Sequence, residues 1–304
     1  MTGQRTPGRD SPVGVIGAGR LGSSLAVAMH RCGYRIAAAS SRRAEQRAWL
    51  GQQIDGVYMA PAAHEVADRC RIVFITSSDA AINEIATELR WRQDQAVVHC
   101  SGAAPVSELQ PAADAGAMIG GFHPMQTFPS REASGSFNGI TFGLETQAAA
   151  LDAWLRQLAS DLGGRCVSIT EAHRAAYHSA AVMACGLLAG LAGLAAEMWA
   201  STGISRDEAL KGLGPLVQST AAWMAEKGIP AAMTGPYVRG DIATIGKHLD
   251  ATAGHSPEHG AAYAAVALAS LHLAKEQGGL SDAAEMRIRE MLVSSLKRSC
   301  EIID

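Results

Sequence analysis

The sequence has few aromatic residues and no excess of positive charge. Tryptophan, tyrosine and phenylalanine together make up 5% of the 304 residues, whereas glycine alone contributes 32. Small residues are therefore expected to make many of the close contacts between helices and backbone. The net charge of −3 argues against the concentrated positive charge that attracts nucleic acid or an anionic membrane. We expect a small-molecule ligand, with no nucleic-acid or membrane partner.

The cysteines form no pattern typical of a metal site or a disulfide framework. They are scattered, with no Cys-x-x-Cys pair and no His/Cys cluster at zinc spacing. The six are Cys32, Cys70, Cys100, Cys166, Cys185 and Cys300. His255 and His259 have a spacing that suits a metal, but no third ligand lies nearby in the sequence. We therefore predict reduced thiols, a cytoplasmic protein and no metal ion.

Two segments of the sequence bear on a membrane or targeting signal. Residues 1–11 are polar and lack the apolar core of a signal peptide, so we expect a flexible tail. Residues 180–196 carry no charge and contain the Gly186-x-x-x-Gly190 spacing that membrane helices also use. Because this stretch is rich in alanine and glycine and has charged neighbours, we predict a buried helix of a soluble domain.

Short β-rich segments alternate with helical ones in the first half, which is typical of a parallel sheet with crossover helices. The predicted strands are 13–16, 35–39, 72–76, 96–99, 118–122, 140–144 and 165–169. The predicted helices between them are 21–32, 42–52, 80–89, 106–115 and 147–162. After Thr170 the strand patterns stop, and helices are predicted at 171–201, 205–227, 241–250, 257–277 and 281–301.

The length and this change of pattern indicate two domains. We predict an α/β protein with an N-terminal Rossmann dinucleotide-binding domain at residues 12–170. An all-α domain that binds substrate follows at residues 171–304.

A glycine-rich turn lies between the first predicted strand and the first predicted helix. Gly17 permits a tight turn, Gly19 lets the backbone approach a pyrophosphate, and Gly22 lets the helix pack on the strand. The amides at the start of the helix would face the phosphates. The predicted phosphate-binding residues are Gly17, Ala18, Gly19, Arg20, Leu21 and Gly22.

No carboxylate follows the second predicted strand, where NAD-preferring sites place an Asp or Glu for the ribose hydroxyls. The residues there are Ser40, Ser41, Arg42 and Arg43. Because a guanidinium group can hold a phosphate bidentately, we predict that the cofactor is NADP(H). Solvated arginines at a helix start are the alternative reading.

Two further loops follow predicted strands of the sheet. Thr76, Ser77 and Asp79 come after one strand, and Cys100 and Ser101 come after the next. Ligands of open parallel sheets bind outside the carboxyl ends of the strands. We therefore expect these loops to flank the nicotinamide and its ribose, although polar turns without such a role would have a similar composition.

Several motifs resemble those of one family, Rossmann-like proteins that carry a C-terminal helical domain of unknown function. They are residues 121–128 (GFHPMQTF), 177–181 (YHSAA) and 234–241 (TGPYVRGD), with Thr244 and His248-Leu249. The family is similar in architecture to ketopantoate reductases, pyrroline-5-carboxylate reductases and the 6-phosphogluconate dehydrogenase superfamily. The resemblance covers nearly the whole chain and implies NADP-dependent reduction of a carbonyl or imine by a homodimer joined through the helical domains.

One position departs from the family pattern. Members often carry Asn in the long helix after the Tyr-His pair, and Gly186 stands at that position here. In ketopantoate reductases, Asn and Lys side chains on this helix hold the substrate. Their absence leaves the assignment of ketopantoate as substrate open.

Reduction of a carbonyl or imine requires a proton donor and a cation for any substrate carboxylate. Glu171, Arg174 and His178 recur at helical spacing in an otherwise apolar segment. His178 is the first candidate for the proton donor, since histidine exchanges protons near neutral pH. A hydrogen-bonded histidine with no catalytic role is the alternative.

Other candidate residues come from two turns. His123 follows a strand and precedes Pro124, so it is expected at the edge of the sheet, either in the site or in a buried turn. Arg239 is expected to hold a substrate carboxylate or to pair with an acid, and Asp241 to cap a helix or act in catalysis. Lys247 and His248 lie within one turn of that helix, in the site or on a solvated face.

Two functions from different classes account for these patterns. The first is an NADP-dependent oxidoreductase that reduces a small carboxylated carbonyl or imine compound, with ketopantoate the leading substrate. The second is a non-catalytic NADP(H)-binding sensor or scaffold. Gly186 favours the second, whereas His178, Arg239 and Asp241 favour the first.

Overall fold

The structure is a computed structural model that describes residues 6–130 and 137–303. Contacts within the chain divide it into two compact units, Met1–Met183 and Ala184–Asp304. This division falls inside a long helix, whereas the sequence pattern changes at its start, after Thr170.

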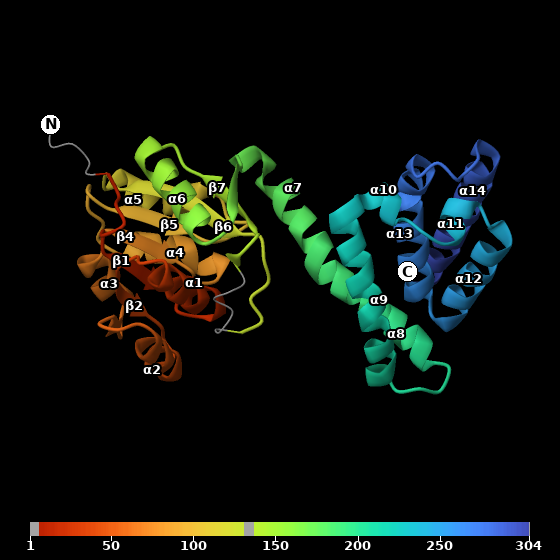
Figure 1. Ribbon diagram of the computed structural model, residues 1–304, viewed down its shortest axis with the longest axis horizontal. Helices are drawn as coiled ribbons and strands as arrows, with labels where there is room; N and C mark the ends of the chain where they lie inside the picture. Colours follow the sequence, from red (N-terminus) through yellow and green to blue (C-terminus); the bar gives the residue numbers. More distant parts are fainter. Residues whose placement is uncertain (1–5, 131–136, 304) are drawn as a thin grey trace. The chain divides into compact units, whose positions relative to one another are not determined.

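The first unit contains an eight-stranded sheet (Figure 1). Its strands are β1 (Val13–Ile16), β2 (Ile36–Ser40), β3 (Tyr58–Ala60), β4 (Ile72–Ile75), β5 (Ala96–His99), β6 (Met118–Pro124), β7 (Thr141–Glu145) and β8 (Arg165–Ser168). Their order is β3-β2-β1-β4-β5-β6-β7-β8, and only the β6–β7 pair is antiparallel. The predicted Rossmann domain is confirmed.

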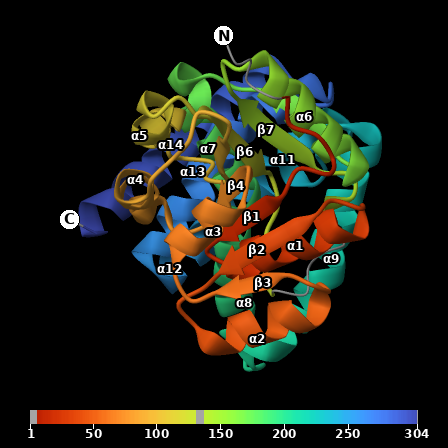
Figure 2. The same ribbon diagram turned by 90° about the vertical axis from the view of Figure 1, so that its left-hand side faces the viewer.

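Helices cover both faces of this sheet (Figure 2). One face packs against α1 (Arg20–Arg31), α2 (Ala44–Gln53) and α6 (Ala149–Asp161). The other packs against α3 (Ala63–Arg69), α4 (Ile82–Glu88) and α5 (Gln110–Asp114). Successive strand residues point to opposite faces, as Phe74 and Ile75 do, so strands covered on both sides are apolar throughout.

All seven predicted strands lie within two residues of observed ones. The strand β3 and the helix α3 were missed. Three residues of β3, one of them the exposed Tyr58, are too short a segment to show the alternation of a strand.

Part of the predicted tail is held against the first unit. The Trp154 indole donates to the Gly8 carbonyl oxygen at 3.3 Å, and Arg9 pairs with Asp161. Arg9 also lies over the ring of Tyr34. Residues 1–5 of the predicted tail lie outside the described residues.

The long helix after β8 consists of α7 (Glu171–Val182), a π-helical turn (Met183–Leu187) and α8 (Leu188–Ala200). By length and composition, Glu171–Ala200 is the one helix in the described part of the chain that could cross a membrane. The prediction that this segment is buried is wrong for the single chain, because 6% of its most apolar window is buried. The side chains of Met183 and Leu187 are 66% and 61% exposed.

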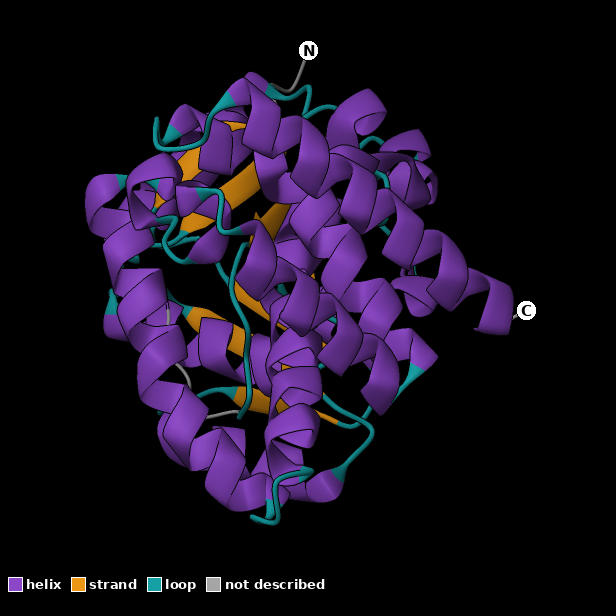
Figure 3. Ribbon diagram, turned by 90° about the vertical axis from the view of Figure 1, so that its right-hand side faces the viewer, coloured by secondary structure: helices purple, strands orange, loops and turns teal. Residues whose placement is uncertain are grey.

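The described residues of the second unit fold entirely into helices and connecting loops (Figure 3). After α8 these are α9 (Arg206–Lys227), α10 (Ile229–Ala232), α11 (Pro236–Arg239), α12 (Ile242–His255), α13 (Pro257–Glu276) and α14 (Asp282–Ile303). Ser205 and Glu208 form a capping box at the start of α9. Ile245, Leu271 and Ile288 join α12, α13 and α14 in one apolar core. The predicted all-helical second half is confirmed.

Candidate active site

The turn between β1 and α1 has the geometry of a phosphate cradle. Gly17 has a φ of +94°, which side chains other than glycine rarely adopt. A β-carbon at Gly22 would lie 2.3 Å from Oγ1 of Thr76 and 2.5 Å from the Gly17 carbonyl oxygen. At Gly19 the space is open, with the nearest atom 3.8 Å away. The first amides of α1 have no side-chain cap at Gly19, so they are free to bind a phosphate.

The end of β2 lies directly beside this turn. The Ser40 carbonyl oxygen accepts hydrogen bonds from the amides of Gly17 (3.0 Å) and Ala18 (2.8 Å). Arg42 and Arg43 are exposed, and neither guanidinium has an ion pair or hydrogen bond in the part of the chain that the structure describes. Because no carboxylate ends β2, these two free cations fit a 2′-phosphate better than a ribose diol.

A pocket of about 240 Å³ lies at the carboxyl edge of the sheet. It joins Leu21 of α1 to the loops after β4 and β5, which contribute Thr76, Ser77, Asp79, Cys100 and Ser101. His123 from β6 and His178 from α7 also line it. All of these residues belong to the first unit and were candidates from the sequence. Burial raises the pKa of the Cys100 thiol to about 12, so this thiol is not a nucleophile at neutral pH.

The two histidines of the pocket are neighbours. Their ring centroids lie 6.0 Å apart with the rings nearly perpendicular. Nδ1 of His123 lies 2.8 Å from the hydroxyl of Tyr177. Burial, aided by the nearby His178 and Arg174, lowers the pKa of His123 to about 4. His123 is therefore neutral at pH 7.

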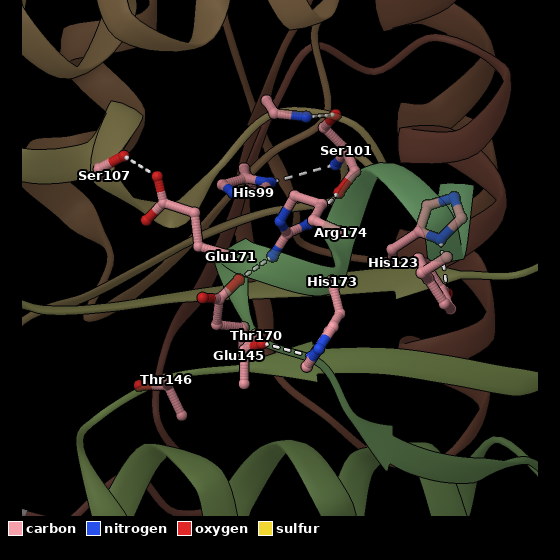
Figure 4. Close-up of polar contacts among 12 residues, drawn as sticks. His99, Ser101, Ser107, His123, Glu145, Thr146, Thr170, Glu171, His173 and Arg174 are labelled. Carbon is pink, nitrogen blue, oxygen red and sulfur yellow. Dashed lines mark hydrogen bonds and ion pairs between the residues drawn. The ribbon is translucent and has the colours of Figure 1, made fainter. Parts of the chain in front are cut away.

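Arg174 lies one helical turn before His178 in α7. Its guanidinium pairs with Glu145 of β7 and donates to the Ser101 carbonyl oxygen at 3.3 Å (Figure 4). Arg174 is 2% exposed, so it is committed to this ion pair and is not available as a surface cation. Together with burial, Arg174 lowers the pKa of His99 to about 3. The sequence placed Glu171, Arg174 and His178 on one face of the helix. In the structure Glu171 is exposed, Arg174 is buried and His178 lines the pocket.

The remaining candidates belong to the second unit. Asp241 caps α12, where its carboxylate accepts from the Thr244 amide (3.1 Å) and hydroxyl (2.7 Å), and these bonds lower its pKa. Arg239 ends α11 and is exposed, as are Lys247 and His248. Nδ1 of His248 lies 3.0 Å from the Tyr263 hydroxyl. The structure therefore groups these four around α12 and in a different unit from His123 and His178.

The sequence predicted no metal ion and only reduced thiols, and the residues concerned lie in both units. His255 and His259 have ring centroids 4.3 Å apart. No cluster of three His, Cys, Asp or Glu suited to a metal occurs among the described residues. All six cysteines are free thiols, and a cytoplasmic location stays a prediction.

Three residues that build the site were not singled out from the sequence. Tyr177 contacts His123, Glu145 neutralises Arg174, and Gly102 lies against both histidines of the pocket. The Tyr177-His178 pair in the family-like motif was the signal for Tyr177. Gly102 follows Cys100 and Ser101 in a loop that was expected beside the nicotinamide. Nothing local showed its contact with the two histidines or marked Glu145, since these contacts are with distant parts of the sequence.

Comparison with known proteins gives matches over both halves of the chain. Residues 3–124 match the model of a Rossmann-like domain, and residues 140–270 match that of a domain of unknown function, DUF2520. The comparison with curated proteins gives no match.

Several solved structures are similar over most of their length. A protein from Bacteroides fragilis, provisionally named an NADP oxidoreductase, is 27% identical with a TM-score of 0.64, covering 93% of this chain and 99% of that chain. A protein from Thermotoga maritima is 21% identical with a TM-score of 0.69, covering 86% and 99%. The Plasmodium falciparum pyrroline carboxylate reductase with NADP bound is 10% identical with a TM-score of 0.61, covering 94% and 99%. The last two likenesses concern the fold alone.

Proposed function

We propose that this chain, a Rossmann-like protein with a C-terminal domain of unknown function, is an NADP-dependent oxidoreductase that reduces a small carboxylated carbonyl or imine compound. Ketopantoate is the leading substrate. One observation carries the proposal: the pocket that begins at the glycine-rich turn also contains His123 and His178. The similarity to the Bacteroides protein, and to the fold of a reductase that binds NADP, supports the same cofactor and reaction type.

Three parts of the first unit are proposed to bind the cofactor. The turn from Gly17 to Gly22 holds the pyrophosphate, and Arg42 and Arg43 hold the 2′-phosphate. Bound NADPH supplies a hydride. The loops after β4 and β5 flank the nicotinamide and its ribose.

The histidines act on the substrate in the same pocket. The carbonyl carbon gains the hydride, and the former π-bond electrons move to the oxygen, which then takes a proton. His178 is the proposed donor of that proton, and His123 is proposed to hydrogen-bond to the oxygen. Arg239, Asp241, Lys247 and His248 belong to the second unit, and the catalytic or substrate-binding roles expected for them stay predictions.

A screen of NADPH oxidation against 2-oxo acids, including ketopantoate, and cyclic imino acids tests this function. Steady oxidation with one compound is expected, and His178→Ala should lower turnover by about 100-fold. His272→Ala, at an exposed position of α13, is the matched control and should retain turnover. Tight NADPH binding without turnover across the panel would contradict the enzyme.

The second candidate, a non-catalytic NADP(H)-binding sensor or scaffold, is favoured by one observation. Gly186 lies in the π-helical turn, and apart from its chain neighbours and the backbone of its own helix, no described atom lies within 4 Å of the position that its β-carbon would take. The amide side chain that family members often place there is absent. Restoring it with Gly186→Asn should increase turnover if the site retains the chemistry, and should change nothing in a pure binding protein.

The chain is further proposed to be a homodimer joined through its helical unit rather than a membrane protein. Leu187, Leu216 and Trp223 are 61%, 62% and 50% exposed on the π turn and α9. Exposed apolar patches of this kind mark interaction surfaces. Gly186 and Gly190 have open space around them, which permits close approach of a second helix.

Light scattering coupled to gel filtration tests the dimer. Wild type is expected at twice the mass of the chain, and Leu216→Asp with Trp223→Asp is expected at the mass of one chain. Met286→Asp, 62% exposed on α14, is the control and should stay dimeric. A detergent requirement for wild-type solubility would contradict the proposal.

A further inference from the structure

Tyr177 reaches His123 because the strand opposite His123 carries no side chain at that point. His123 of β6 pairs with Gly143 of β7 in the antiparallel ladder, where paired side chains lie on the same face. A β-carbon at Gly143 would lie 2.5 Å from the hydroxyl oxygen of Tyr177. The ring of Tyr177 therefore occupies the place of the missing side chain, next to His123.

The hydrogen bonds of the Tyr177 hydroxyl have a defined direction. Burial raises the pKa of the Tyr177 hydroxyl, and the Gly143 backbone counteracts part of this rise. A phenol O–H is still a stronger acid than the N–H of a neutral imidazole, so the hydroxyl donates its single hydrogen in its contact with His123. Nδ1 of His123, at 2.8 Å, is the one acceptor for that hydrogen in the described part of the chain.

This direction determines where His123 carries its proton. When Nδ1 accepts, a neutral imidazole carries its hydrogen on Nε2. In the described residues no hydrogen bond involves Nε2, and His123 lines the pocket. The pocket therefore contains the Nε2–H group of His123, which has no hydrogen-bond partner among the described residues.

We propose that Tyr177 is a positioning residue that holds the proton of the neutral His123 ring on Nε2, so that the pocket offers a hydrogen-bond donor and selects a carbonyl oxygen over an iminium ion. A carbonyl oxygen has lone pairs that accept from Nε2–H, whereas the nitrogen of an iminium ion has none and carries a positive charge. The selection of a carbonyl rests on the proposed reductase function. The tautomer does not, because it follows from the contacts of the protein alone.

The tautomer is measured by 15N–1H long-range correlation on histidine-labelled protein at pH 7. Wild-type His123 is expected to give a single neutral form with hydrogen on Nε2. Tyr177→Phe removes the donor and should produce a population with hydrogen on Nδ1. Tyr34→Phe, which removes a hydroxyl that donates to Asp161 at 2.7 Å in the same unit, is the matched control and should leave His123 unchanged.

The substrate preference is measured as the ratio of kcat/KM for a 2-oxo acid to that for a five-membered cyclic imino acid. Wild type should favour the 2-oxo acid, and Tyr177→Phe should lower this ratio by about tenfold because the donor is no longer held in place. A general loss of stability would lower both values and leave the ratio constant.

The possible results test the role of Tyr177 and the selection of a carbonyl substrate separately. Hydrogen on Nδ1 in wild type, or an unchanged tautomer in Tyr177→Phe, overturns the role of Tyr177. If Tyr177→Phe fails to fold, the wild-type tautomer still decides. The expected tautomer with equal ratios for both substrate classes overturns the selection of a carbonyl. The expected tautomer without any turnover overturns the proposed function and leaves the role of Tyr177 supported.

Discussion

A β-carbon on Gly102 would lie 2.8 Å from Nε2 of His123. The same β-carbon would lie 2.7 Å from Cδ2 of His178, so the absence of a side chain at Gly102 allows both imidazoles to reach the pocket. The loop after β5 therefore sets the position of both proposed catalytic rings.

Gly102→Ala should lower kcat/KM by about 100-fold, because both imidazoles must move from their positions over the substrate. The affinity for NADPH should change less than kcat/KM, since the proposed pyrophosphate site lies in a different loop, the glycine-rich turn. Gly254→Ala in α12, where no atom lies within 4 Å of the added carbon, is the matched control. Steady-state kinetics and fluorescence titration with NADPH give the two quantities, and equal kcat/KM for both variants would contradict this role of Gly102.

Arg42→Ala should weaken NADPH binding by about tenfold or more and leave NADH binding unchanged, because only NADPH carries the 2′-phosphate. Arg90→Ala, at an exposed position after α4, should affect neither. Titration of both cofactors into each variant measures the preference. An unchanged ratio of the two dissociation constants in Arg42→Ala would remove this residue from the cofactor site.

Glu145→Gln should reduce the free energy of unfolding by about 3–5 kcal/mol, because it leaves the buried Arg174 charge without its partner. Asp152→Asn breaks the exposed i,i+4 pair with Arg156 and should cost about 0.5 kcal/mol or less. Urea unfolding of the two variants provides the comparison. Similar losses of unfolding free energy in the two variants would show that burial does not increase the cost of breaking the Glu145–Arg174 ion pair.

The free energy of unfolding should fall as the pH is lowered from about 6.5 toward 4. In the folded protein the pKa is about 4 for His123 and about 3 for His99, whereas an unfolded histidine has its ordinary value near 6.5. Between these values the unfolded chain binds more protons, so acid favours unfolding, by at most about 1.4 kcal/mol per pH unit for each histidine. Above pH 7 neither group contributes to the pH dependence.

Urea unfolding at several pH values between 7 and 4 measures this slope. His123→Gln should flatten it, since one of the two neutral histidines is removed. His272→Gln, at an exposed position, should retain the wild-type slope. An equal slope in wild type, His123→Gln and His272→Gln would show that His123 does not contribute to the pH dependence.

Local patterns were sufficient for the longer strands and helices and for the glycine-rich turn, although not for β3, α3, α10 and α11. A strand such as Val13–Ile16 followed by closely spaced glycines restricts the backbone by itself, because tight turns and close helix packing exclude side chains at Gly17 and Gly22. The resemblance to Rossmann-like proteins with a C-terminal domain of unknown function was also correct, since its motifs are contiguous in the sequence.

The arrangement of the candidate site was decided by contacts between distant segments. Helical spacing placed Arg174 and His178 on one stripe, but the tertiary structure pairs Arg174 with Glu145 and brings His178 to the pocket. Likewise, Tyr177 meets His123 only because the β6–β7 register sets Gly143 opposite His123. Spacing along one helix fixes which side chains share a face, whereas burial and partner depend on strand register and loop packing, which no local segment of the sequence encodes.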